Sequence, residues 1–376
     1  MAAQKIVVIG AGIAGASIAA GLAHHADVTV LEAEDAAGYH TTGRSAAMYL
    51  ASYGNDLIRA LTRASYDFLD TPPESFVTQP LLHRRGLLTL ADAEHAALLD
   101  QPPFDRHRRL TMAEAQQLVP VIRADDFVGA RFDAEAADID VDLLHQSYLR
   151  QARAHGAQIL MRHRIADATR SGGRWQIATE MGDSFTADLI VNAAGAWGDQ
   201  VAALFGAKPV GLSPRRRTMV LVDPPAGQSI ERWPFTMTVQ EYVYFRPESG
   251  KIAISPADET EDVPSDVQPD ELDIAIAVDR FQHLVDMAVP RISHSWAGLR
   301  TFAADRSPVF GHDPEVEGFF WFVGQGGYGI QMAPAAAEVG AALALGRSLA
   351  HDLIDDGVTP DLLSPARFRS DKENCA

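Results

Sequence analysis

The feature that most constrains this chain is a glycine-rich turn near its N-terminus. A short apolar, β-branched run, Lys5 to Ile9, is followed at once by Gly10-Ala11-Gly12-Ile13-Ala14-Gly15. We expect a strand over 5–9, a helix over 16–24 and a second strand over 27–31, which together make a βαβ unit. In such a turn Gly10 allows the tight bend, Gly12 lets the backbone approach a pyrophosphate at the helix N-terminus, and Gly15 permits close packing of helix on strand.

Glu32 completes this pattern, because it stands 20 residues after Gly12 at the end of the second expected strand. A carboxylate in that position accepts hydrogen bonds from the adenosine ribose hydroxyls and disfavours the 2'-phosphate of NADP. The turn alone would also fit an ordinary loop, but strand, helix and distal acid together predict a dinucleotide site. We assign to it Gly10, Gly12, Ile13, Ala14, Gly15 and Glu32.

Length and charge limit the remaining possibilities. A chain of 376 residues with 47% hydrophobic content predicts a globular protein of two domains or of one large composite domain. Its net charge of -18 disfavours both nucleic acid and anionic membranes as partners. The single cysteine, Cys375, excludes a disulfide framework and a cysteine-rich metal site, and no histidine pair has metal-ligand spacing, so we expect no metal.

The apolar stretch 6–23 has the length of a signal peptide or a membrane span. It contains four glycines, only Lys5 precedes it as a charge, and no small-residue cleavage site follows before Glu32. We therefore expect neither export nor stable membrane insertion. The expected location is the cytoplasm, and peripheral contact with the inner face of the membrane stays open.

The order of predicted elements indicates that the first domain is interrupted. We expect helices over 57–69, 112–118 (capped by Thr111), 142–155, 269–289 and 333–345, with short strands over 86–90, 127–132, 158–164, 175–180, 184–190, 218–222, 242–246 and 251–255. The predicted fold class is α/β plus β. A discontinuous Rossmann-like domain would comprise 1–78, 138–204 and 298–376, and an inserted β-rich substrate domain would comprise 79–137 and 205–297.

The glycine-rich turn at 10–15, which we call the fingerprint turn, is followed by four further notable segments. They are Tyr39 to Ala46, Val191 to Gly195, Trp296 to Arg300 running on to Asp305 and Pro308, and Gln325 to Gln331. In this order they resemble the D-amino acid oxidase family of FAD oxidoreductases, which includes glycine oxidase, sarcosine oxidase and D-amino acid dehydrogenases. Within that family the chain is most similar to bacterial enzymes of the D-arginine dehydrogenase type. The resemblance implies that the Rossmann-like domain binds FAD, and we expect no covalent bond to it because the sole cysteine lies far along the tail.

The resemblance also implies which residues lie near the flavin and its phosphates. They are Thr42, Gly43, Arg44, Ser45, Ala46, Ile165, Ala194, Gly195, Arg300, Gly326, Gly327, Tyr328, Gly329, Ile330 and Gln331. Consecutive backbone N–H groups at the Gly-rich turn would stabilise the negative charge of a reduced flavin. A plain tight loop at 324–329 and a buried strand end at Ile165 are the structural alternatives.

A substrate carboxylate requires a cation, and the resemblance points to Arg217 and Arg300, whose planar guanidinium groups can pair with it bidentately. The alternatives are a structural salt bridge for Arg300 and a solvated face for the run Arg215 to Arg217. Tyr53 and Tyr244 match tyrosines that contact the substrate in similar enzymes. An ordinary loop or strand tyrosine would also explain each of them.

Departures from the D-arginine dehydrogenase pattern indicate an apolar side-chain pocket. Leu87 stands where those enzymes carry an acid that pairs with a cationic substrate, and Met48 stands where they carry histidine. We assign to this pocket Met48, Leu50, Leu87, Phe235, Met237 and Gly327. A buried substrate guanidinium without a counter-charge is strongly disfavoured. An acid displaced to Glu241 or Glu74 remains the alternative.

These features predict an FAD-dependent oxidoreductase that oxidises apolar D-amino acids by hydride transfer to the flavin, giving a 2-oxo acid and ammonia. Its partners would be the small-molecule substrate and an electron acceptor, which could be oxygen, a quinone or a dye. Oxidation of a secondary amine or of a 2-hydroxy acid uses the same carboxylate clamp and is the neighbouring hypothesis. A flavin-binding sensor or assembly subunit without turnover is the hypothesis from another class.

Overall fold

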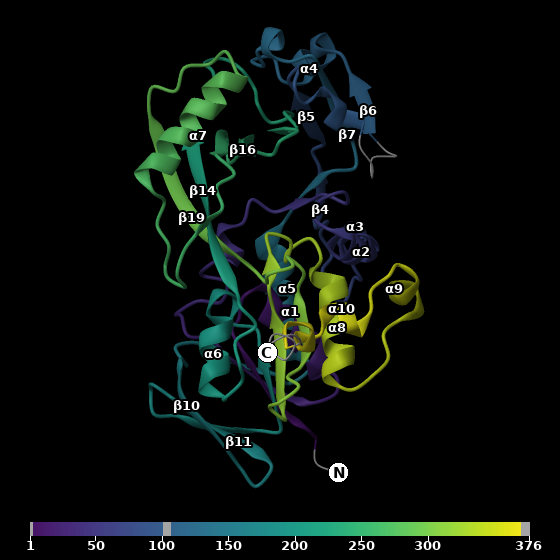
Figure 1. The fold of residues 1–376 in the computed structure, drawn as a ribbon, viewed down its shortest axis with the longest axis vertical. Helices are drawn as coiled ribbons and strands as arrows, with labels where there is room; N and C mark the ends of the chain where they lie inside the picture. The colour runs from purple at the N-terminus through teal and green to yellow at the C-terminus, as the bar shows by residue number, and fades with distance from the viewer. Residues whose placement is uncertain (1–2, 101–106, 370–376) are drawn as a thin grey trace, which may run out of the picture.

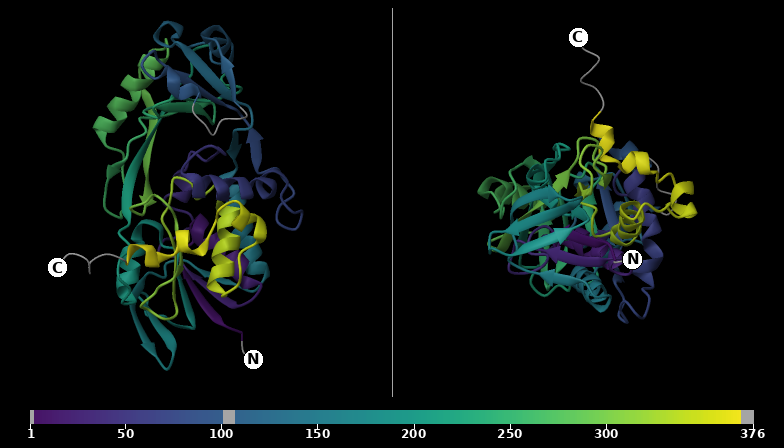
Figure 2. Two further views of the ribbon diagram at one scale, coloured as in Figure 1. Left: turned by 45° about the vertical axis from the view of Figure 1, so that its right-hand side comes forward. Right: turned by 90° about the horizontal axis from the view of Figure 1, so that it is seen from below.

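The computed structural model describes residues 3–100 and 107–369, so Cys375 lies outside the described residues. Two lobes are stacked along the long axis of the molecule (Figure 1). The strands β14 (Ser213–Val222) and β19 (Ile292–Phe302) run from the upper lobe into the lower one, and Figure 2 shows the same two lobes after a turn about that axis. Among the described residues, no helix combines the length and the apolarity needed to cross a bilayer.

The lower lobe is built on a six-stranded sheet of order β20-β21-β13-β1-β2-β9. All neighbouring strands in it are parallel except β20, which is antiparallel to β21. Its strands are β1 (Lys5–Ile9), β2 (Asp27–Leu31), β9 (Gln158–Leu160), β13 (Leu189–Asn192), β20 (Val309–His312) and β21 (Phe319–Val323). Ile6 and Val8 pack into one hydrophobic cluster and Val7 and Ile9 into another, so β1 is covered on both faces and reads as one continuous apolar run.

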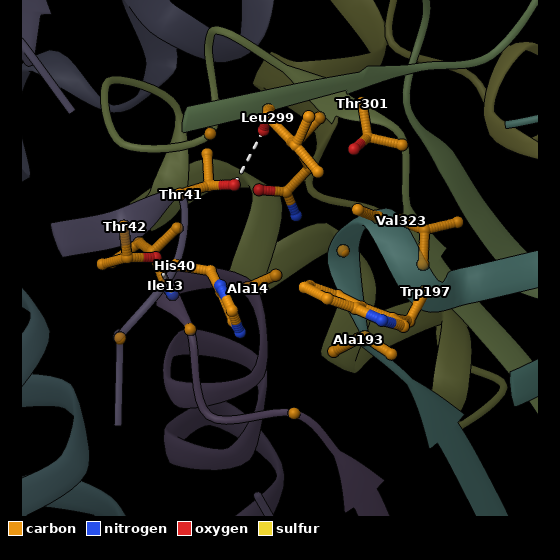
Figure 3. Close-up of a pocket in the computed structure, with 18 of the residues that line it drawn as sticks. Ile13, Ala14, His40, Thr41, Thr42, Ala193, Trp197, Leu299, Thr301 and Val323 are labelled. Atoms are coloured by element: carbon orange, nitrogen blue, oxygen red, sulfur yellow. Dashed lines mark hydrogen bonds between the residues drawn. The ribbon is translucent and has the colours of Figure 1, made fainter. Parts of the chain in front are cut away.

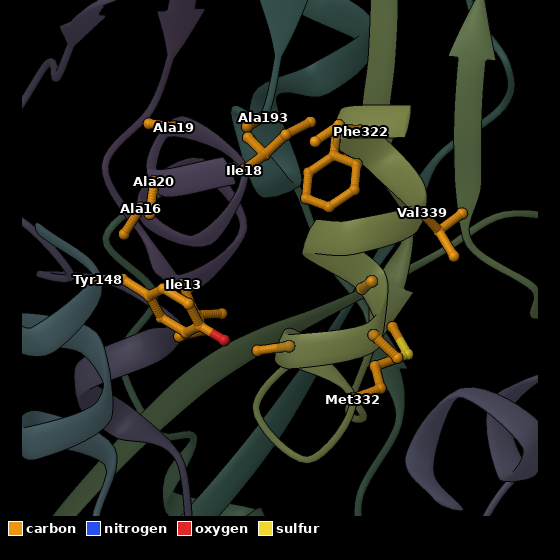
Figure 4. Close-up of a cluster of buried hydrophobic side chains, with 14 of the residues drawn as sticks. Ile13, Ala16, Ile18, Ala19, Ala20, Tyr148, Ala193, Phe322, Met332 and Val339 are labelled. Carbon is orange, nitrogen blue, oxygen red and sulfur yellow. The ribbon is translucent and has the colours of Figure 1, made fainter. Parts of the chain in front are cut away.

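Helices cover one face of this sheet, where the side chains of α1 pack closely against its neighbours (Figure 4). Gly21 and Gly340 permit this approach, because a Cβ at Gly21 would lie 3.1 Å from that of Ala341 and a Cβ at Gly340 would overlap the Phe322 ring. The other face carries a three-stranded sheet and α6. The elements of this lobe are α1 (Ile13–Ala23), α2 (Asp56–Ala64), α3 (Tyr66–Asp70), α5 (Val141–Ala154), α6 (Gly198–Leu204), α8 (Ala333–Ala344), α9 (His351–Asp355), α10 (Pro360–Leu363), β10 (Ile165–Ser171), β11 (Arg174–Thr179) and β12 (Ser184–Ala187).

The upper lobe holds a ten-stranded sheet of order β22-β19-β14-β17-β16-β15-β5-β7-β6, with β18 pairing off this path to β14. Phe245 packs against Phe281 of α7 on one face, whereas the preceding Tyr244 joins an apolar cluster on the other. The elements are β5 (Leu87–Ala91), β6 (His107–Leu110), β7 (Gly129–Asp133), β14 (Ser213–Val222), β15 (Phe235–Thr238), β16 (Tyr244–Glu248), β17 (Lys251–Ser255), β18 (Thr260–Glu261), β19 (Ile292–Phe302), β22 (Gln325–Gly326), α4 (Met112–Leu118) and α7 (Glu271–Leu284). A three-stranded sheet is formed by β3 (Met48–Tyr49), β8 (Ala137–Ile139) and β4 (Leu82–Arg84).

Several of the expected helices and strands are confirmed with the bounds that the sequence predicts. The strands at 5–9, 27–31 and 251–255 and the helix at 112–118 have the predicted bounds, and Thr111 caps that helix through the N–H of Glu114. The expected helix over 57–69 is divided at Ser65, whose hydroxyl donates to the Leu61 carbonyl and accepts from the N–H of Ala335.

Two other expected elements are longer than the ones observed. The strand over 158–164 stops at Leu160, because the chain turns at Arg162, which has φ of +63°. The helix over 269–289 spans only Glu271–Leu284, and Val285 is extended. The proposed domain boundary at 297/298 falls inside β19, which belongs to the upper sheet along its whole length.

Candidate active site

A cavity of about 470 Å³ lies where the two lobes meet (Figure 3). Its lining combines the fingerprint turn after β1, the end of β2, the segment 38–46, the segment 193–197 and parts of β14, β16 and β19. Thr41 donates its hydroxyl hydrogen to the Leu299 carbonyl at 2.7 Å, which joins two parts of this lining that are distant in sequence. The site therefore depends on the tertiary fold.

The fingerprint turn requires its glycines for steric reasons. Gly10 has φ of +99°, and a Cβ there would lie 2.7 Å from the Ala193 carbonyl oxygen. A Cβ at Gly15 would overlap the Gly10 carbonyl oxygen. Gly12 precedes α1 without a side-chain cap, so the positive end of that helix opens on the cavity between Gly12 and Ala14.

Glu32 lines the cavity, and its carboxylate is held in place by two backbone groups. It accepts a hydrogen bond from the N–H of Ala11 at 2.6 Å and from the N–H of Glu34 at 2.9 Å. Ile13 and Ala14 also line the cavity, but the N–H of Ile13 already donates to the Thr42 hydroxyl at 2.9 Å. Thr42 thus fixes the start of the helix against the segment 42–46.

The segment 42–46 divides into lining and supporting residues. Thr42, Ser45 and Ala46 line the cavity, whereas Gly43 donates its N–H to the Gly38 carbonyl at 2.8 Å and lies behind it. Arg44 reaches the cavity, but its guanidinium donates to the carbonyls of Val267 and Ala297, at 3.1 Å each, and pairs with Asp266. Its charge therefore ties this segment to the chain on either side of α7.

The remaining predicted cofactor residues fall into the same two groups. Those that line the cavity are Ile165, Ala194, Gly195, Arg300, Gly326, Gly327, Gly329 and Ile330. Tyr328 and Gln331 are buried behind it. The Gln331 side chain accepts from the N–H of Leu50 at 3.1 Å and donates to Thr62 at 3.0 Å, and the Tyr328 ring meets the Tyr53 ring edge-on with centroids 5.0 Å apart.

Arg300 is partly buried at the cavity wall, and its Nη1 donates to the Tyr53 hydroxyl oxygen at 3.3 Å. Within residues 3–100 and 107–369 no carboxylate lies within ion-pair distance of it, so the structural salt bridge considered for it is not formed there. Pairing of β22 with β19 brings Gly327 against the guanidinium. A cation removed from water without a counter-charge is costly, which makes this position a strong candidate for binding an anion.

Arg217 is 9% exposed, so the solvated face considered for it is wrong. The strand alternation of β14 directs Arg216 to Asp273 of α7 at 2.9 Å and Arg217 to the cavity. Arg217 donates to the Asp258 carbonyl at 2.8 Å and to Glu259 Oε1 at 3.3 Å. Unlike Arg300, it already has an acidic partner.

Tyr244 lines the cavity with both arginines, and the Arg217 Cζ lies 5.9 Å from its ring centroid. Burial acts to raise the pKa of the Tyr244 phenol, but the positive charges of Arg217 and Arg300 outweigh it and hold that pKa below its ordinary value. The hydroxyl donates to the Met219 sulfur at 3.5 Å. The two guanidinium groups therefore act together on this phenol.

The predicted side-chain pocket forms one apolar cluster with Met219 and Tyr244. Its members from the sequence prediction are Met48, Leu50, Leu87, Phe235 and Met237. Of this cluster, Met219, Tyr244 and Ala46 line the cavity and the five predicted residues do not, so their contact with a substrate side chain stays a prediction. The alternative acids Glu241 and Glu74 are exposed and do not line the cavity.

The sequence analysis did not assign Met219, His40 and Trp197, which line the cavity, or Glu259, which contacts Arg217 from outside the lining. The signal for Met219 was present, because it stands two residues after Arg217 on one strand and so shares its face. His40 and Trp197 face each other with ring centroids 4.6 Å apart, and Figure 3 shows both at the cavity. Nothing in the sequence pairs them, since they come from separate loops.

Comparison with known proteins identifies the chain. The model of the DAO family, described as FAD dependent oxidoreductase, matches residues 5–343. The chain belongs to this family. It is therefore an enzyme of the FAD-dependent oxidoreductase class, and the expected cofactor and fold class are confirmed.

Individual proteins of known name are similar to nearly the whole chain. Glycine oxidase of Bacillus licheniformis is 25% identical over 371 residues, which are 93% of this chain and 95% of that protein. The solved structure of glycine oxidase from Geobacillus kaustophilus has a TM-score of 0.77 at 22% identity and covers 95% of this chain and 99% of that one. L-proline dehydrogenase from P. horikoshii has a TM-score of 0.79 at 22% identity, covering 98% of each chain.

The cavity fits FAD on its own geometry. The close approach at Gly10 and Gly12 leaves no room for side chains where the pyrophosphate is expected, and the fixed Glu32 carboxylate can receive the ribose hydroxyls. The backbone of 326–330 lines the same cavity next to Arg300, where the flavin is expected. When bound there, FAD would supply a two-electron acceptor.

Proposed function

We propose that the protein oxidises the Cα–N bond of D-amino acids with apolar side chains. The substrate loses a hydride from Cα and a proton from nitrogen, and the resulting imino acid hydrolyses to a 2-oxo acid and ammonia. The observation that carries this proposal is Arg300, a partly buried cavity arginine with no acidic partner among the described residues. A substrate carboxylate would supply the missing counter-charge.

Arg300 would act by orientation. Its guanidinium lies against the backbone of Gly327, next to the expected flavin position, so a carboxylate paired with it is held beside the acceptor. The Tyr53 hydroxyl accepts a hydrogen bond from Arg300 and would hold the guanidinium in place, and Tyr244, which lines the cavity, would contact the substrate. Holding the reacting atoms in this way can lower a barrier by several kcal/mol, which about matches the loss expected when the arginine is removed.

The preference for apolar side chains rests on the wall formed by Met219 and Tyr244 with the apolar cluster to which they belong. The D-arginine dehydrogenase type requires an acid to receive a cationic side chain, and here Leu87 is only 5% exposed within that cluster. A cationic side chain would meet methionine, leucine and aromatic groups in place of a carboxylate. We therefore expect D-leucine, D-methionine and D-phenylalanine to be better substrates than D-arginine or D-lysine.

Oxidation of a secondary amine is the second candidate. It is favoured by the full-length likeness to structures named as L-proline dehydrogenase and iminodiacetate oxidase. Both candidate reactions use a carboxylate on Arg300, and they differ in what the amine nitrogen carries. Product analysis separates them, because a primary amine yields 2-oxo acid and free ammonia in equal amounts, whereas a cyclic secondary amine releases no ammonia.

The test is to incubate the purified protein with an electron-accepting dye and both enantiomers of leucine, phenylalanine, arginine and proline, together with glycine and iminodiacetate. The proposal predicts 2-oxo acid and ammonia from the D-enantiomers of leucine and phenylalanine above all. Turnover confined to proline, glycine or iminodiacetate would replace it by the second candidate or a relative of it.

A further inference from the structure

The two guanidinium groups at the cavity differ in what they contact. Arg217 meets the carboxylates of two consecutive residues, Glu259 at 3.3 Å and Asp258 at 4.0 Å. Arg300 meets none among the described residues and donates to the neutral hydroxyl of Tyr53. Of the two cations, Arg300 is thus the one with an open position for a carboxylate.

Glu259 is itself held from a second direction. Arg306 donates to its two carboxylate oxygens at 2.9 and 3.0 Å, and the Arg306 guanidinium lies 4.0 Å from the Phe302 ring centroid. This bidentate pair fixes the orientation in which Oε1 also reaches Arg217. The carboxylate is therefore presented to Arg217 by a partner outside the cavity, since Arg306 does not line it.

Glu259 keeps its charge in this position. Burial acts to raise its pKa, but Arg306, Arg217 and Arg300 together hold that pKa below the ordinary value for glutamate. A full negative charge thus stands beside Arg217 at neutral pH. It cancels the attraction that Arg217 would otherwise exert on an anion, and it repels a second anionic group of a ligand that is already bound to Arg300.

We propose that Glu259 is a specificity-determining residue that reserves the site for substrates with a single carboxylate. Arg300 binds that carboxylate, and Glu259 cancels the second cationic position, Arg217, to which another carboxylate on the same molecule would go. Acidic amino acids are excluded by this charge in addition to the apolar wall. The inference rests on the proposed function, because it takes Arg300 to be the carboxylate-binding residue.

Equilibrium binding to the holoenzyme tests this without turnover. Butyrate and succinate have the same four-carbon chain but one and two carboxylates, so the ratio of their dissociation constants, measured by isothermal titration calorimetry, isolates the effect of the second charge. Wild-type protein should bind butyrate more tightly. Glu259→Gln should shift the ratio toward succinate by about tenfold or more, because it removes the repulsion and leaves Arg217 only the more distant carboxylate of Asp258, at 4.0 Å.

Two further variants make the test specific. Arg306→Gln should shift the ratio of dissociation constants toward butyrate, because Glu259 would then pair with Arg217 alone. Glu261→Gln is the matched control, because Glu261 is an exposed glutamate on the same segment and forms no ion pair among the described residues. It should leave the ratio unchanged.

An unchanged ratio in Glu259→Gln, with butyrate binding intact, would overturn the inference while leaving the proposed function standing. If that variant loses its flavin, Arg306→Gln decides alone, and a shift toward succinate would overturn the inference equally. Failure of both probes to bind the wild-type holoenzyme would overturn the proposed function together with the inference.

Discussion

The guanidinium of Arg300 lies against the backbone of Gly327, so closely that a Cβ at residue 327 would stand 2.6 Å from the arginine Cζ. The contact arises because β22 adds to the edge of β19 and carries the chain back past Arg300. Glycine at 327 is therefore required by the position of a side chain 27 residues earlier in the sequence.

Gly327→Ala should displace the arginine and reduce kcat/KM by at least about tenfold, since a misplacement of roughly 1 Å can cost more than this. Steady-state kinetics with D-leucine measures the loss, and the flavin spectrum reports whether the cofactor is retained. Gly129→Ala is the control, because a Cβ there meets its nearest neighbour at an ordinary 3.6 Å. Equal activity of the two variants would show that Arg300 does not need its present position.

The cofactor released from the protein should be FAD, whereas FMN lacks the pyrophosphate and adenosine ribose that Gly10, Gly12 and Glu32 address. Acid or heat should release it intact, because we expect no covalent bond, and mass spectrometry identifies it. Glu32→Gln should weaken FAD binding, as it removes the charge from the ribose position. A protein-bound flavin that survives denaturation would contradict the expectation of non-covalent binding.

Among primary D-amino acids, kcat/KM should rise with side-chain size from D-alanine towards D-leucine, D-methionine and D-phenylalanine. Each further buried methylene should contribute roughly 0.8 kcal/mol until the pocket is full. D-arginine and D-lysine should lag by about tenfold or more. Leu87→Glu should move the preference toward these cationic substrates, and Leu87→Gln, of similar size without the charge, should not. Faster turnover of D-arginine than D-leucine by the unmodified protein would contradict the assignment of an apolar pocket.

His145 should make the stability of the fold depend on pH. It is 3% exposed, its Nε2 bonds the Ala11 carbonyl at 2.8 Å, and burial lowers its pKa below the ordinary value. The unfolded chain then binds more protons than the folded one, so stability falls as the pH drops below about 6.5. The midpoint of thermal unfolding should decline less steeply over this range in His145→Gln than in wild type, and exposed His283→Gln should follow wild type. Identical slopes in all three would remove His145 as the cause.

The sequence predicts those parts of the site that lie within one local pattern. The fingerprint turn, Glu32 and the strands around them were predictable because adjacent residues specify a strand, a tight turn and a helix start. The role of Arg300 came from resemblance, and its lack of an acidic partner is visible only in three dimensions.

What could not be predicted depends on contacts between distant segments. Glu259 reaches Arg217 because the chain after β17 folds back over β14. The Gln331 side chain forms its hydrogen bonds with Leu50 and Thr62, which come from another part of the lobe. The five apolar residues lie in one cluster, but the sequence does not show that Met219 and Tyr244 of that cluster are the ones that line the cavity.

The most direct test of the central claim is anaerobic mixing of the yellow holoenzyme with D-leucine, for wild type, Arg300→Met, Arg300→Lys and the exposed control Arg153→Met. Without an acceptor, the flavin absorbance bleaches only if the amino acid is oxidised. Wild type and Arg153→Met should bleach completely and fast. Arg300→Met should retain its flavin, but its apparent second-order rate constant for bleaching should fall by an amount equivalent to about 3 kcal/mol of transition-state stabilisation. Arg300→Lys should recover only part of this loss. Bleaching of Arg300→Met at the wild-type rate, or no bleaching of wild type by any apolar D-amino acid, would contradict the account.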